Sequence, residues 1–194
     1  SNNYYWYRNI NIGNITIIKM KLYRAIKSNY FVQGFGENLL PIYKELGMLG
    51  HTGIDLGCWS GEPIYHSGDW DGIVMTEVDN AGGYGVNVIS KEPMEDGRYY
   101  KLRYWHLKEF KVYDGQEVKC GDLLGLGDST GLSTGDHLHF GLKPCDKDGN
   151  SLEPNNGYFG AIDPLPYYEN VFVGEVLQTK QLALSVIELA KAVI

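Results

Sequence analysis

Short runs of apolar residues that alternate with polar ones fill the chain from about residue 51 to residue 142. Typical runs read GIVMTEV, YGVNVIS, YYKLRYWHL and DLLGLG, and pairs of glycines interrupt this region. Alternation with a period of two places the apolar side chains on one face of a strand. Many short strands separated by turn residues are typical of an antiparallel sandwich or open barrel. We therefore predict an all-β core built as an antiparallel β-sandwich or open barrel.

A helical period occurs near the C-terminus, where apolar residues recur at steps of four, three and four. These residues are Leu182, Val186, Leu189 and Val193. Such spacing places them on one side of a helix, which we expect to run from about Val173 to Ile194. Earlier in the chain, the pattern predicts one or two strands over 21–33 and a short helical turn within 38–50.

These patterns divide the chain into three regions. We expect an N-terminal extension over 1–19, a globular domain over 20–168, and an amphipathic C-terminal α-helix over 169–194. The extension is expected because the character of the sequence changes at Met20. Since the chain begins with Ser1 and not with Met, we interpret it as a fragment or a processed product.

Composition narrows the class of protein. A chain of 194 residues that is 43% apolar suits one domain with a buried core. The net charge of −7 disfavours a nucleic-acid partner. No apolar run reaches the roughly 20 residues of a membrane helix, so we expect no transmembrane segment, and we find no signal peptide. The three cysteines are widely spaced, which indicates reduced thiols and no disulfide framework.

The first candidate for chemistry is a pair of histidines in STGDHLHFGL. His137 and His139 are two residues apart, so on a strand both leave the same face. Two imidazoles on one face can serve one metal, or they can divide metal binding and proton transfer between them. A surface strand with two solvated histidines explains the pair equally well.

Two further motifs add histidines to this set. In GHTGIDLG, His51 and Asp55 would lie about 13 Å apart on a straight strand, so a shared metal requires the chain to turn between them. In YKLRYWHL, a period of two places His106 on the face of apolar neighbours, either in the core or in a cleft. We interpret His66, which has no such companions, as a surface or turn residue.

Together these motifs resemble the lysostaphin-like zinc endopeptidases of peptidase class M23, which cleave bacterial peptidoglycan peptides. GHTGIDLG matches the family's Gly-His-x-Gly-x-Asp, YWHL matches Tyr-x-His-Leu, and HLHF closes the set in the same order. The resemblance runs from about residue 33 to residue 144. It implies a lysostaphin-type fold, so that the 20–168 region would be a zinc peptidase domain.

The resemblance also implies roles for five residues. His51, Asp55 and His139 would bind one zinc ion per chain, and His106 and His137 would handle protons beside it. Three protein ligands leave a position for water, whose pKa zinc lowers while it polarises the scissile carbonyl. A neutral imidazole can then accept a proton, and an imidazolium can stabilise the oxyanion or protonate the leaving amine.

Two residues depart from the family pattern near these motifs. Asp136 replaces the proline that usually precedes His-x-His, and Gly141 stands where a glutamate often follows the phenylalanine. Neither change removes a candidate ligand, and both bear on the width and polarity of the substrate groove.

Other interpretations stay open at this point. The chain could be a catalytically inactive M23-like module that binds the cell wall or activates a partner, or a zinc hydrolase for another peptide. DGQEVKCGDLLG resembles the hairpin of lipoyl and biotinyl carrier domains, but the modifiable lysine at a tight turn is missing. The expected partner is a peptidoglycan peptide, outside the cytoplasmic membrane, in the cell envelope or on a virion. The C-terminal helix could attach the domain to a phage particle or an envelope assembly.

Overall fold

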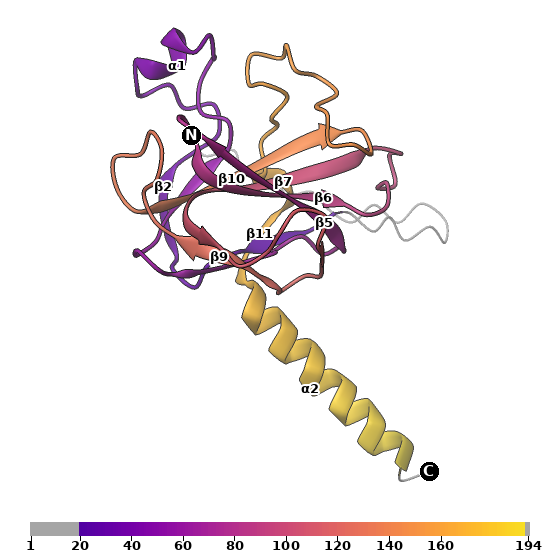
Figure 1. Ribbon diagram of the computed structural model, residues 1–194. Coiled ribbons are helices and arrows are strands. Elements are labelled where there is room, and N and C mark those ends of the chain that lie inside the picture. Colours follow the sequence, from indigo (N-terminus) through magenta and orange to yellow (C-terminus); the bar gives the residue numbers. More distant parts are fainter. Residues whose placement is uncertain (1–19, 193–194) are drawn as a thin grey trace, which may run out of the picture.

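The computed structural model describes residues 20–192, so the extension predicted over 1–19 lies outside the described residues. Figure 1 shows a twisted β body from which one long helix projects. The elements follow in the order β1 (Leu22–Arg24), β2 (Tyr30–Gln33), α1 (Ile42–Glu45), β3 (Ile54–Gly57), β4 (Pro63–Tyr65), β5 (Gly72–Asp79), β6 (Gly83–Ser90), β7 (Tyr99–Phe110), β8 (Glu117–Val118), β9 (Leu123–Gly127), β10 (His137–Cys145), a 3-10 turn (Leu165–Tyr167), β11 (Tyr168–Phe172) and α2 (Val173–Ala192).

Nine of the strands form one antiparallel sheet. Its order is β2-β3-β10-β7-β6-β5-β8, and β9 pairs with both β4 and the end of β7. The long strand β7 therefore belongs to two parts of the sheet, which lets the sheet fold over on itself around a core without closing. The predicted all-β antiparallel class is confirmed, with the strands and the helical turn expected between residues 21 and 50.

The core lies on one face of the central strands, and alternation places it there. Leu138, Phe140 and Leu142 on β10 are fully buried, as are Leu102 and Tyr104 on the neighbouring β7. The residues between them on each strand point to the opposite face. That opposite face carries the candidate chemistry described below.

The three cysteines are free thiols, as the sequence predicted. Burial is the main cause that raises their pKa values, to about 12 for Cys58 and about 11 for Cys120 and Cys145.

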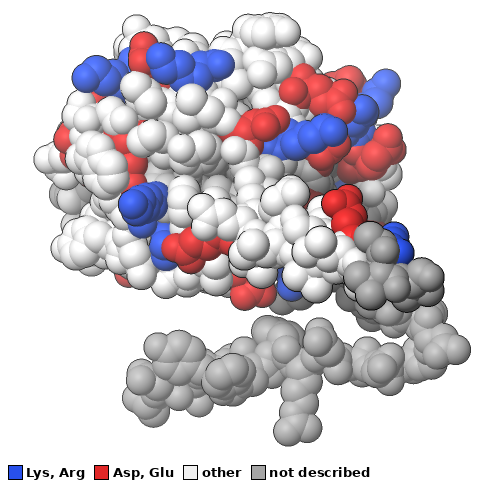
Figure 2. Space-filling view, turned by 90° about the horizontal axis from the view of Figure 1, so that it is seen from below, with Lys and Arg blue, Asp and Glu red and all other residues white. Residues whose placement is uncertain are grey.

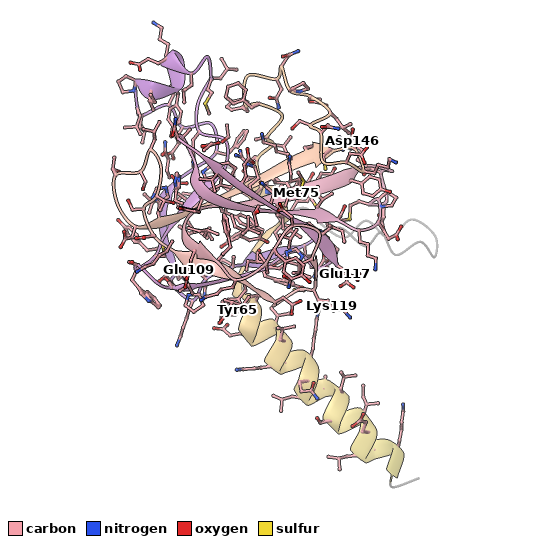
Figure 3. All side chains as sticks on the ribbon, in the orientation of Figure 1. Tyr65, Met75, Glu109, Glu117, Lys119 and Asp146 are labelled. Carbon is pink, nitrogen blue, oxygen red and sulfur yellow. The ribbon has the colours of Figure 1, made fainter. Side chains whose placement is uncertain are left out.

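The chain leaves the β body through β11 and α2. β11 pairs in parallel with β1, and Val173, the first residue of α2, is fully buried. Past its first residues the helix projects from the β body into solvent (Figures 1 and 3). Leu182 and Leu189 are each 69% exposed. The C-terminal helix is thus present. It begins at the buried Val173, directly after β11 ends at Phe172.

Charges of both signs are scattered over the face of the molecule seen in Figure 2, in small mixed groups. No helix within residues 20–192 is long and apolar enough to cross a membrane.

Candidate metal and catalytic site

A tight turn before β3 brings His51 and Asp55 together. His51 Nε2 lies 3.0 Å from Asp55 Oδ1, so the chain does curl between them. Gly53 is where the turn meets β10: a Cβ there would lie 2.5 Å from the Phe140 carbonyl oxygen and 2.9 Å from His139 Cε1. Only a residue without a side chain allows this approach.

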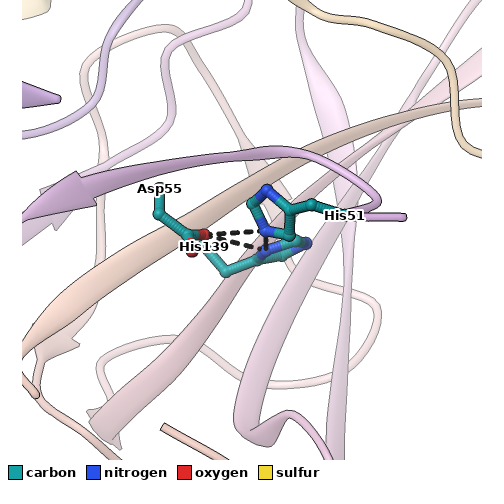
Figure 4. A group of neighbouring side chains, drawn as sticks. All are labelled: His51, Asp55 and His139. Carbon is teal, nitrogen blue, oxygen red and sulfur yellow. Dashed lines mark hydrogen bonds and ion pairs between the residues drawn. The ribbon is translucent and has the colours of Figure 1, made fainter. Parts of the chain in front are cut away.

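His139 completes a group of three converging atoms. Its Nδ1 lies 2.9 Å from His51 Nε2 and 3.1 Å from Asp55 Oδ1, so the three atoms form a nearly equilateral triangle (Figure 4). β10 pairs with β3 so that His139 stands directly opposite Asp55. All three residues are buried. Residues 84 or more positions apart thus meet because two strands are neighbours.

This donor set fits a zinc ion. Zinc binds imidazole nitrogen and carboxylate oxygen at about 2.0–2.2 Å, and two ligands at tetrahedral angles then lie about 3.3–3.6 Å apart. The observed distances of 2.9–3.1 Å are slightly shorter than that edge. Among the described residues 20–192, His51, Asp55 and His139 form the one group of three or more His, Cys, Asp or Glu side chains whose ligand atoms lie close enough to share a metal ion.

The protonation of the group favours metal binding. His51 Nδ1 lies 3.0 Å from the Gly34 carbonyl oxygen, which can only accept, so the proton sits on Nδ1 and Nε2 presents a lone pair. Burial lowers the pKa of His139 to about 3, although Asp55 opposes that change. Burial acts to raise the pKa of Asp55, but the neighbouring imidazoles of His139 and His51 outweigh it and lower this pKa. At neutral pH Asp55 is therefore a carboxylate and His139 a neutral imidazole, the states in which these side chains bind a metal.

His137 and His106 form a second pair of imidazoles beside the triangle. Their ring centroids are 4.6 Å apart, and the His106 ring is 6.0 Å from that of His139. His137 Nε2 lies 3.5 Å from Asp55 Oδ2. The structure thus brings together all five polar residues that the sequence singled out.

Main-chain carbonyls orient both imidazoles of this pair. His106 Nδ1 donates to the Thr130 oxygen at 2.7 Å, and His137 Nδ1 donates to the Gly135 oxygen at 2.8 Å. In the neutral form of either ring, this tautomer leaves a lone pair on Nε2. Burial, followed by the nearby His137, lowers the pKa of His106. Sequence reasoning missed these carbonyls, because backbone groups leave no mark in a motif.

The expected strand alternation fails at His106. A period of two would place it in the core with Leu102 and Tyr104, but its φ of +67° turns the side chain out of that series. The pairing of β7 with its neighbours shifts at the same place. His106 and Trp105 therefore leave the core face together, which is how His106 reaches His137.

The interpretation of His66 as a surface or turn residue is wrong. His66 is fully buried, its Nδ1 lies 3.1 Å from Tyr104 Oη, and its Nε2 donates to the Trp70 oxygen at 2.8 Å. Burial lowers its pKa to about 4. His66 is a neutral, satisfied core residue on the far side of Tyr104 from the candidate site.

The sequence matches a known peptidase family. The family model of Peptidase family M23 matches residues 49–154, more than half of the chain, and this range contains all five polar residues of the site. Peptidoglycan DD-endopeptidase ShyB of Vibrio cholerae is 40% identical over 90 residues, which cover 46% of this chain and 20% of that protein. Glycyl-glycine endopeptidase ALE-1 of Staphylococcus capitis is 29% identical over 148 residues, or 75% of this chain and 36% of that protein.

Solved structures show the same architecture. The catalytic domain of the antimicrobial peptidase lysostaphin from Staphylococcus simulans has a TM-score of 0.54 and 28% identity, covering 71% of this chain and 90% of that chain. A zinc containing peptidase from Vibrio cholerae has a TM-score of 0.57 and 25% identity, covering 78% and 40%.

Fold and sequence together define a lysostaphin-type domain of the class that hydrolyses peptide bonds. The chain belongs to peptidase family M23. The resemblance drawn from the motifs is therefore confirmed. The matched segments span only 20% to 36% of the length of these two curated relatives.

Proposed function

We propose that this chain is a zinc-dependent endopeptidase that hydrolyses peptide bonds in the stem peptides or cross-bridges of bacterial peptidoglycan. The observation that carries the proposal is the convergence of two imidazole nitrogens and one carboxylate oxygen within 3.1 Å, with two more imidazoles beside them. Membership of the M23 family and relatives named as peptidoglycan endopeptidases support the substrate class.

In this proposal His51, Asp55 and His139 hold one zinc ion per chain. When bound, zinc supplies a Lewis acid that polarises the scissile carbonyl and activates water. The Gly34 carbonyl fixes the tautomer of His51, and the pairing of β3 with β10 fixes the distance between Asp55 and His139. The ligands therefore need little rearrangement to bind the ion.

His106 and His137 handle protons beside these ligands. The neutral state of His106, favoured by burial, makes its Nε2 a proton acceptor at neutral pH. An imidazolium at His137 would face Asp55 Oδ2 at 3.5 Å, so this site can hold a positive charge near the developing oxyanion or pass a proton to the leaving amine.

The place of action follows from the substrate. Peptidoglycan lies outside the cytoplasmic membrane, so we propose that the chain acts in the cell envelope or outside the cell. The relatives' names differ in the bond that they give, a DD-endopeptidase in one and a glycyl-glycine endopeptidase in another. The expectation that α2 attaches the domain to a phage particle or an envelope assembly stays a prediction.

The test combines metal analysis with digestion of purified peptidoglycans of different cross-link chemistry, followed by mass analysis of the fragments. We expect about one zinc per chain, release of new amino termini, and loss of that activity after treatment with a chelator. A folded protein that takes up no transition metal after zinc supplementation would refute the proposal. That result would favour an inactive binding or activator module.

A further inference from the structure

Just past His139, strand β10 places Gly141 opposite Arg103 of β7. On the same face of β10, Gly141 follows His139 and Lys143 follows Gly141. The antiparallel register places Trp105 opposite His139 and Arg103 opposite Gly141. Arg103 is therefore one step along the sheet from the proposed zinc ligands.

A rigid indole supports the Arg103 side chain. The guanidinium carbon lies over the Trp105 ring at 4.4 Å from its centroid. Trp105 is 1% exposed and donates from Nε1 to Asn87 Oδ1 at 3.2 Å, and a Cβ at Gly82 would overlap its ring. Since the indole has no room to move, the guanidinium that stacks on it is held in a defined place.

No described residue between 20 and 192 accepts a hydrogen bond from the Arg103 guanidinium or forms an ion pair with it. The neighbouring cations are engaged: Lys143 Nζ donates to the Phe159 oxygen and Lys101 Nζ to the Gly149 oxygen, both at 2.7 Å. Those bonds tie the two lysines to the loop after β10. The five donors of Arg103 stay available, although the side chain is partly buried.

The acidic residues nearest to Arg103 have other partners. Glu77 accepts a hydrogen bond from Asn87 Nδ2 at 3.1 Å, and Asp79 accepts one from the Ala81 amide at 2.8 Å. Both carboxylates oppose the effect of burial, which lowers the pKa of Arg103. A half-buried cation without a direct counter-ion is costly, so this place favours an incoming anion.

Gly141 leaves the space beside Arg103 free on the β10 side. A Cβ at this position would meet the Thr52 oxygen at 3.4 Å and Arg103 Cβ at 3.5 Å, which are ordinary contacts. The glycine is therefore not required by crowding. Its effect is that β10 supplies no side chain to cover or neutralise the guanidinium opposite.

We propose that Arg103, stacked on Trp105 beside the proposed zinc ligands, binds a free carboxylate of the peptide substrate and makes the site selective for anionic peptides. The inference rests on the proposed function and adds the charge of the substrate to it. A planar guanidinium can bind a carboxylate through two parallel hydrogen bonds, which gives both orientation and affinity.

The probes are synthetic cross-linked stem peptides that differ only in their carboxyl groups. One has all carboxylates free, one has its terminal carboxylate amidated, and one has its side-chain carboxylate amidated. Two measurements are made on each zinc-loaded protein: kcat/KM for cleavage, and Kd by calorimetry with the His137→Ala background, in which turnover is slow. The two amidated peptides identify which kind of carboxylate Arg103 binds.

The variants separate charge from shape. For the wild type we expect one amidation to reduce kcat/KM and affinity roughly 10- to 100-fold, the range for a hydrogen bond to a charged group. Arg103→Gln should remove this difference, and Arg103→Lys should keep part of it. Gly141→Glu, which places a carboxylate opposite Arg103, should also remove it, whereas the neutral Gly141→Gln of equal size should preserve it.

Every outcome decides the matter. If the wild type binds or cleaves free and amidated peptides equally, or if Arg103→Gln keeps the wild-type difference, the inference is overturned. If the wild type binds zinc but cleaves none of the peptides, while the zinc-loaded His137→Ala protein distinguishes them in calorimetry, the proposed function fails and the inference stands. Should Arg103→Gln not fold, the comparison of Gly141→Glu with Gly141→Gln gives the answer.

Discussion

At the scale of single residues, the two histidines of His-x-His have different surroundings. His139 Nδ1 lies within 3.1 Å of both His51 and Asp55, whereas the nearest approach of His137 to these two residues is 3.5 Å, to the second oxygen of Asp55. The same strand face therefore carries one histidine inside the proposed ligand group and one beside it.

This difference predicts opposite effects of two substitutions. His139→Ala leaves two protein ligands, so zinc content should fall close to zero, because zinc sites normally have at least three. His137→Ala should keep zinc near full occupancy while turnover falls roughly 10²–10⁴-fold. The measurements are elemental analysis and turnover at matched folding. Zinc loss in His137→Ala with retention in His139→Ala would invert the assignment.

His106→Ala should behave like His137→Ala, with zinc retained and turnover reduced by a similar factor. Because both imidazoles act on one transition state, the double variant should lose much less than the product of the two single losses. A fully multiplicative loss would show that the two residues act in separate steps.

His66 gives a prediction for stability against pH. Its pKa is lowered to about 4 in the folded chain from 6.5, so below pH 6.5 the unfolded chain binds a proton that the folded chain does not. The stabilisation from neutral His66 should be complete above pH 6.5 and be lost as the pH falls to about 4. NMR titration of the imidazole and thermal unfolding at each pH measure it. In the non-titrating His66→Gln variant, stability should lack this dependence on pH between about 4 and 6.5. A measured His66 pKa near 6.5 in the folded chain would refute the prediction.

Residue-scale features divide clearly into those that sequence predicts and those it does not. The five polar residues of the site could be found because they lie in three short motifs, GHTGIDLG, YWHL and HLHF. The burial of His66 could not, because its partner Tyr104 is 38 residues away and joins it only through the core. The free guanidinium of Arg103 is likewise visible only once Gly141 is known to lie opposite.

At the scale of elements, the approach of β3 to β10 brings the proposed zinc ligands together, and Gly53 permits it. Gly53→Ala should destabilise the fold by about 1–3 kcal/mol, because its Cβ would be forced against the Phe140 carbonyl and His139. Zinc affinity should fall as well, since His139 must shift. Gly135→Ala is the matched control, because a Cβ there meets nothing within 4 Å. Urea unfolding and zinc titration of both variants test this, and equal stabilities would contradict it.

Strand alternation predicted most of β7 and β10, and its failure at His106 shows its limit. Period two correctly separates Leu102 and Tyr104 from Arg103 and Trp105. At His106 the positive φ and the shifted pairing depend on how β6 and β9 meet β7, and none of these contacts is local in sequence. The family motif implied that His106 lies beside the proposed zinc ligands, whereas strand alternation placed it on the face of Leu102 and Tyr104.

At the scale of the whole molecule, the β body ends later than the sequence predicted, because β11 precedes the helix. The predicted boundary at residue 168 falls at the start of β11, which pairs with β1, and the next element begins with the buried Val173. Leu177 also lies against Gly121, in the loop between β8 and β9. The first turn of α2 therefore anchors the helix, and the rest is exposed.

Two truncations test this division. A chain that ends after Gln178 keeps β11 and the anchor, so its thermal stability, zinc content and peptidase activity should match those of the full chain. A chain that ends after Tyr168 loses β11 and Val173, and it should unfold at a lower temperature. If the chain that ends after Gln178 is folded and zinc-loaded but inactive, the exposed part of α2 contributes to the site.

The alternation of strand β10 limits which sequence changes this domain can tolerate. Its odd-numbered residues His137, His139, Gly141 and Lys143 face the site, and the even-numbered residues between them fill the core. Deleting or inserting one residue in the strand would exchange the two sets, sending imidazoles into the core and leucines onto the face that carries the candidate site. New substrate preferences can therefore arise here through substitution, as at position 141, whereas length variation is confined to the loops on either side.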